Sequence, residues 1–79
     1  MLDCARMDRK MTEEHLVQAE DAVLAGESHV ARQREIVSEL EQKGQDATTA
    51  RDLLVTFLDL QEQHVAHRDR LRHELGLDR

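Results

Sequence analysis

Glu41-Gln42-Lys43-Gly44-Gln45-Asp46-Ala47 decides the fold of this chain, because it separates two long runs with helical periodicity. Gly44 suits the left-handed position that follows many helix ends, and Asp46 is a residue type that caps the start of the next helix. The 79 residues include no proline that would interrupt either run. A connection this short predicts two antiparallel neighbouring helices folded about Gly44.

The first run is predicted to be a helix over about residues 12–43, with Thr12 as its N-cap. Its apolar residues recur at seven-residue spacing: Leu16, Val23, Val30 and Val37. Gly26 inside a helix costs about 1 kcal/mol relative to alanine, so we expect another segment to approach it closely. Residues 1–11 are interpreted as a loose or partly helical lead-in to a single domain over residues 12–79.

The second run is predicted to be a helix over about residues 47–75 with strict three-four spacing. That spacing runs through Ala50, Leu54, Phe57, Gln61, His64, Arg68, Leu71 and Leu75. Gly76 suits a helix C-terminus in the same way as Gly44. The two predicted lengths match, so the hairpin is expected to close along its full length.

Antiparallel pairing about the turn aligns residues whose numbers sum to about 91. This register places His29 and Gln33 opposite Gln61 and His64, between apolar layers near the turn and near the open end. A polar layer in a helical seam costs stability and fixes register or oligomeric state, which is how we interpret it.

The alternative interpretation of this layer is a metal or proton site built on His29, His64 and His67. Two copies of the layer would supply four imidazoles, and zinc commonly takes four such ligands. The chain has no Glu-x-x-His pair, no His-Glu-x-x-His motif and no cysteine pair. We therefore predict no metal and no cofactor, and keep a metal- or pH-responsive regulator as the second hypothesis.

The composition argues against several classes of function. Eleven Lys and Arg against 17 Asp and Glu give a net charge of −6, the wrong sign for neutralising phosphates of nucleic acids. No apolar run approaches the ~20 residues of a membrane span, and the absence of tryptophan argues against a helix lying on a membrane surface. No glycine-rich phosphate loop or nucleophile arrangement is recognisable, so we predict no enzyme and no catalytic residue.

The N-terminus has no apolar core of signal-peptide type, and we predict a cytoplasmic protein. A single cysteine, Cys4, excludes an intrachain disulfide. We interpret Cys4 as a reduced thiol, with an intermolecular disulfide or a reactive thiol as the alternative.

A lone two-helix hairpin is expected to leave apolar side chains uncovered on its flanks. The candidates are Val23, Val30, Val37, Leu58, Leu60 and Val65. Contiguous exposed patches of this kind usually mark interfaces. The sequence thus predicts an all-α hairpin that dimerises into a four-helix bundle and serves as a structural, protein-interaction or regulatory module, with a further protein partner of unknown identity.

Several short sequence segments resemble segments of a group of small uncharacterised bacterial proteins, chiefly proteobacterial. They are HVARQREIV at residues 29–37, ELE at 39–41, GQD at 44–46, ARDLLVTF at 50–57 and HVAHRDRL at 64–71. The resemblance covers about residues 13–75. It implies a single helical unit over this range, and it implies no catalytic residues because the group has no established activity.

Overall fold

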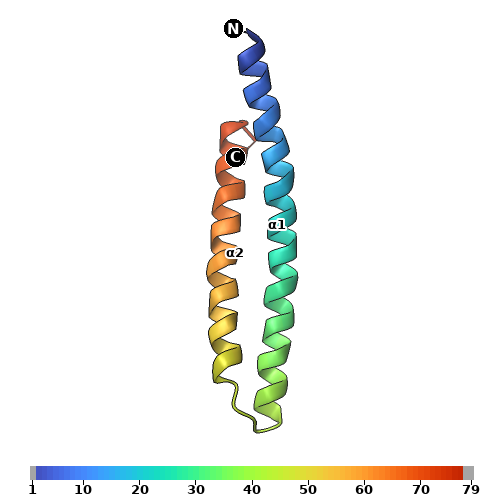
Figure 1. Cartoon of the computed structure of the whole chain (residues 1–79), viewed down its shortest axis with the longest axis vertical. Helices are drawn as coiled ribbons and strands as arrows, with labels where there is room; N and C mark the ends of the chain where they lie inside the picture. The colour runs from blue at the N-terminus through green and yellow to red at the C-terminus, as the bar shows by residue number, and fades with distance from the viewer. Residues whose placement is uncertain (1, 78–79) are drawn as a thin grey trace.

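The computed structural model describes residues 2–77, and the side chains of residues 8–77 among them. Within that range it contains two helices, α1 (Leu2–Gln42) and α2 (Thr48–Glu74). The helices lie antiparallel and side by side, and together they form a rod of 64 × 20 × 14 Å (Figure 1). The predicted all-α antiparallel hairpin is confirmed.

The turn at Gly44 has the hydrogen-bonding pattern of a Schellman motif. Gln45 N–H donates to the Leu40 carbonyl at 2.8 Å and Gly44 N–H donates to the Glu41 carbonyl at 3.1 Å. Gly44 has φ of 68°, a left-handed conformation that a side chain would disfavour. The same pattern recurs at the end of α2, where Gly76 has φ of 71°. Both predicted glycine positions are confirmed.

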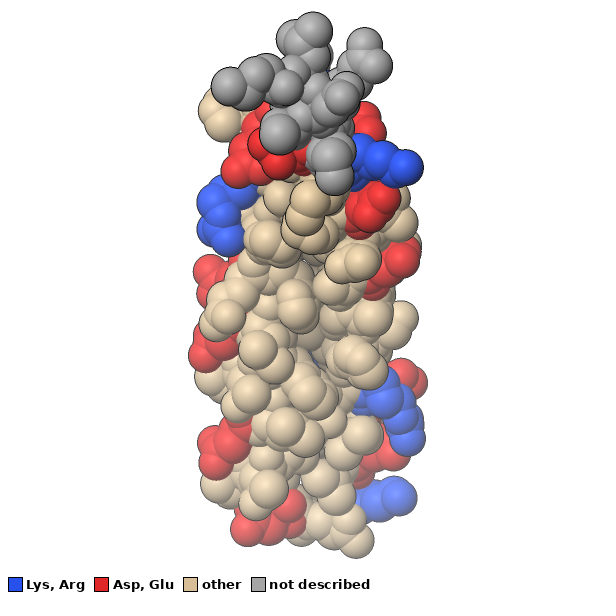
Figure 2. Space-filling view, turned by 45° about the horizontal axis from the view of Figure 1, so that its top comes forward, with Lys and Arg blue, Asp and Glu red and all other residues tan. Residues whose placement is uncertain are grey.

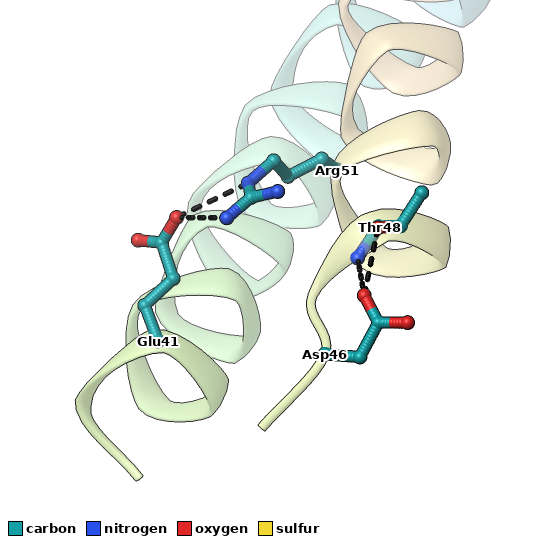
Figure 3. A network of polar contacts seen from close by, with 4 residues as sticks. All are labelled: Glu41, Asp46, Thr48 and Arg51. Carbon is teal, nitrogen blue, oxygen red and sulfur yellow. Dashed lines mark hydrogen bonds and ion pairs between the residues drawn. The ribbon is translucent and has the colours of Figure 1, made fainter. Parts of the chain in front are cut away.

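The start of α2 differs from the prediction by one residue. Ala47 takes the N-cap position, and its methyl group is buried. Asp46 lies one residue earlier, where its carboxylate accepts hydrogen bonds from the Thr48 N–H at 2.9 Å and the Thr48 hydroxyl at 2.7 Å (Figure 3). These two bonds from Thr48 lower the pKa of the Asp46 carboxyl, because they favour its charged form.

The predicted start of α1 at Thr12 is wrong. Thr12 lies inside the helix, where its hydroxyl donates back to the Asp8 carbonyl at 2.9 Å, so it caps nothing. The lead-in predicted for residues 1–11 belongs to α1 from Leu2 on, and this includes the backbone of Cys4, whose side chain is not described. With 41 residues against 27, α1 extends beyond the end of α2, so the hairpin does not close along its full length (Figure 1).

The core is thin and lies between the helices. Its buried apolar residues are Leu16, Ala19, Val23, Val37, Ala47, Leu71 and Leu75. Leu16 and Ala19 pack with Leu71 and Leu75 to close the open end. Among the described residues, no large side chain is completely shielded from solvent. Each helix thus covers only part of the other.

The helices pair about one turn away from the predicted register. Gly26 lies against Gln61 rather than level with Val65 or Arg68, and His29 packs on Phe57. The reason lies in residues 45–47, which are not helical and separate the end of the turn from the start of α2. Because these residues do not continue the helical path, α2 begins farther from the turn and is displaced toward the open end.

Candidate functional site

Gln61 reaches across the seam and fills the space left by the missing side chain of Gly26. Its Nε2 donates to the Val23 carbonyl at 2.9 Å. A Cβ added at Gly26 would overlap the carboxamide and would come within 2.7 Å of Gln61 Cδ. The close approach predicted from a glycine inside a helix is confirmed. Gln61 Oε1 is buried without a hydrogen-bond partner and faces the Cα–H of Gly26, which offers it only a weak contact.

Gln33 makes the matching contact from α1 to α2. Its side chain is buried, and its Nε2 donates to the Ala50 carbonyl at 2.9 Å. The two glutamines therefore satisfy backbone carbonyls at two separate levels. The predicted single layer of His29, Gln33, Gln61 and His64 is wrong, because the one-turn displacement of α2 separates these residues.

The three candidate histidines do not converge on a common point. The exposed His29 stacks at a tilt of 34° on Phe57 with ring centroids 5.9 Å apart. The exposed His67 lies with its Nδ1 3.4 Å from Nη2 of Arg70, while His64 is half-buried. Within the described residues, no group of three His, Cys, Asp or Glu side chains is arranged to hold a metal ion.

One side of the seam carries uncharged side chains, and we call it the neutral face. Its rows, at seven-residue spacing on the two helices, are Ala22, His29 and Ile36 on α1 and Leu53, Leu60 and His67 on α2. Leu53 and Leu60 are each 43% exposed. Figure 2 shows this side as a broad strip free of Lys, Arg, Asp and Glu, with charged side chains at its edges. On α2 the row meets a carboxylate only at Glu74, at the end of the helix.

The other side of the seam carries mostly ionised side chains, and we call it the charged face. Its rows are Glu20, Glu27, Arg34 and Glu41 on α1 and Arg51, Leu58, Val65 and Arg72 on α2. Ion pairs join the helices at both ends of this face. Arg51 donates from Nη2 to Oε2 of Glu41 at 2.8 Å (Figure 3), and Arg72 donates from Nη2 to Oε2 of Glu20 at 3.2 Å.

Apolar residues also interrupt the charged face. An open groove of about 350 Å³ lies between the helices there, and Leu24 lines it together with Glu27, Arg68 and Arg72. Leu24 is 62% exposed, more than either leucine of the neutral face. Because charged groups surround Leu24, its exposure does not form part of a continuous apolar strip.

The predicted exposed flank is partly wrong. Val23 and Val37 are buried in the seam, since the row that starts at Leu16 faces α2 directly. Val30, Leu58 and Val65 are half-buried, and Leu60 is exposed as predicted. The ion pairs of the charged face were not predicted, although their seven-residue spacing beside the seam is visible in the sequence.

No family model, no characterised protein and no solved structure matches this chain at a significant level. Among the described residues, neither helix has a stretch long and apolar enough to cross a membrane. The two faces of the hairpin are therefore its most distinctive features.

Proposed function

We propose that this hairpin is a protein-interaction module that works as a homodimer, in which two copies form a four-helix bundle. The observation that carries the proposal is the incomplete cover of the apolar residues in and beside the seam. No large described side chain is fully buried, and Leu53 and Leu60 stay 43% exposed. Covering such residues with a second hairpin removes their apolar area from water.

The size of the chain supports the same proposal. A domain of this length buries a small fraction of its surface and usually gains stability from disulfides, a metal or oligomerisation. One cysteine excludes an intrachain disulfide, and the described side chains form no metal cluster. Association is the remaining way to complete the core.

Sedimentation equilibrium of the full chain across micromolar concentrations tests the proposal. We expect a particle of twice the chain mass that dissociates only on dilution, with helical content that falls as the dimer dissociates. A well-folded monomer at all concentrations would contradict it. Such a result would mean that the single hairpin is stable although its core is partly exposed.

The second hypothesis, a metal- or pH-responsive regulator, has one contact in favour of its proton-sensing version. His67 accepts a hydrogen bond from Arg70 at 3.4 Å when its Nδ1 is unprotonated. Protonation of this imidazole places two cations side by side on α2. Titration calorimetry with zinc tests whether the protein is a metal-responsive regulator. Heat from stoichiometric zinc binding would support that hypothesis.

A further inference from the structure

We propose that the second copy docks on the neutral face, with α1 of one hairpin against α2 of the other and both turns at the same end. This proposal rests on the proposed homodimer and adds the face and the orientation. Three features of the structure support it: the distribution of charge, the area of the face, and the gradient of side-chain type along it.

The charge distribution favours the neutral face over the charged face. The ion pairs Glu41–Arg51 and Glu20–Arg72 are already formed within one chain and are about half exposed. A second copy that buried these ion pairs would remove their hydration and would add no new ion pair. The free-energy cost of desolvating paired ions often exceeds their Coulomb attraction. The neutral face has no ionised row to desolvate, and two copies of a chain with a net charge of −6 repel least across it.

The area of the neutral face matches what a stable dimer needs. The 27 residues of α2 define a paired length of about 40 Å, at about 1.5 Å per residue. The rod is 20 Å wide, so each copy offers about 800 Å². A specific interface of standard size buries about this much surface on each partner.

The gradient along the neutral face sets the orientation. Its large apolar residues, Ile36, Leu53 and Leu60, lie in the half nearer the turn. The small Ala22 and the polar His67 lie in the half nearer the open end. Two hairpins with adjacent turns pack apolar half on apolar half, and each Ala22 leaves room for the larger His67 of the other copy. The reverse orientation would bury leucines against His67 and Arg70.

A matched pair of charge substitutions tests the choice of face. Leu60→Glu on the neutral face should weaken dimerisation at least about tenfold, because a buried carboxylate without a partner is costly. Leu24→Glu on the charged face makes the same chemical change at a more exposed leucine and should leave the dimer constant within about twofold. Sedimentation equilibrium measures both constants, and circular dichroism confirms that each variant is helical.

Leu53→Glu provides a second neutral-face variant if Leu60→Glu fails to fold. Dissociation by Leu24→Glu with an intact Leu60→Glu dimer would overturn the choice of face and leave the homodimer standing. A monomeric wild-type chain would remove both proposals and leave the neutral face for a different protein.

Cross-linking tests the orientation. In a Cys4→Ser background, Gln45→Cys places one exposed thiol on the turn. A short bis-maleimide should join two such chains, and the Leu60→Glu version should not be joined at the same concentration. In the reverse orientation the thiols lie about 40 Å apart, beyond its reach. An intact dimer that resists cross-linking would overturn the proposed orientation.

Discussion

The neutral face and the charged face flank the same seam and are built from the same two helices, but their chemistry is opposite. Six of the eight residues that define the charged face are ionised: Glu20, Glu27, Arg34, Glu41, Arg51 and Arg72. The six residues that define the neutral face include no Lys, Arg, Asp or Glu. The ion pairs of the charged face stabilise a single hairpin, but the exposed leucines of the neutral face do not. The difference supports the proposal that a second copy covers the neutral face and leaves the charged face in water.

The largest expected effect is the coupling between the two residues that align the faces. Gly26→Ala overlaps the end of the Gln61 side chain, so the carboxamide must rotate away and lose its hydrogen bond to the Val23 carbonyl. A lost hydrogen bond costs about 0.5–1.5 kcal/mol, and alanine gains about 1 kcal/mol over glycine in a helix. Urea denaturation of Gly26→Ala alone should therefore show only a small net change in the free energy of unfolding.

A double-mutant cycle separates this contact from helix propensity. Gln61→Ala removes the carboxamide, and Gly26→Ala combined with Gln61→Ala should be more stable than the sum of the single changes predicts. A coupling free energy of about 1 kcal/mol or more is expected for side chains in contact. Strict additivity would mean that the Gly26–Gln61 contact does not hold the helices in register.

Removing an ion pair from the charged face should have a smaller effect. Arg72→Met eliminates the contact with Glu20, and exposed ion pairs of this kind contribute about 0.2–1 kcal/mol. The loss should appear in urea denaturation at low ionic strength and shrink in high salt. Arg34→Met makes the same change elsewhere on the charged face, at a residue for which the described structure gives no ion pair, and it should cost less.

The smallest effect is expected at Asp46, outside both faces. The hydrogen bonds from Thr48 hold its pKa below the ordinary value of 3.8, so the bonds stabilise the fold above that pH. This contribution disappears as pH falls through the lowered folded-state pKa. Thermal unfolding of Asp46→Ala and wild type should differ slightly at neutral pH and converge in strong acid. A difference that persists there would assign the effect to the backbone of the turn.

The sequence was sufficient to predict those features of the fold that depend only on residues close together in the chain. Gly44 and Gly76 end their helices through a backbone conformation that glycine adopts most readily, and the heptad-like runs define two helices. The need for close approach at Gly26 also followed from propensity alone.

The register was not predictable from the same reasoning. It depends on the non-helical residues 45–47, and nothing in their composition specifies how far they displace the start of α2. The shift moved Gln61 onto Gly26 and separated it from His29 and Gln33. The candidate polar layer depended on that register, so the prediction of the layer was wrong. Its polar residues are present, but they lie at different levels of the seam.

The contacts of Gln61 and Gln33 also have a mechanical consequence. Two packed helices slide most readily along their common axis, in steps of one turn. The Val23 and Gln33 ends of these contacts are ten residues apart on α1, about 15 Å. A shear force along the hairpin must therefore break both amide contacts together. The Gln61 carboxamide packed on Gly26 thus resists sliding of α2 along α1 and keeps the two helices in one register.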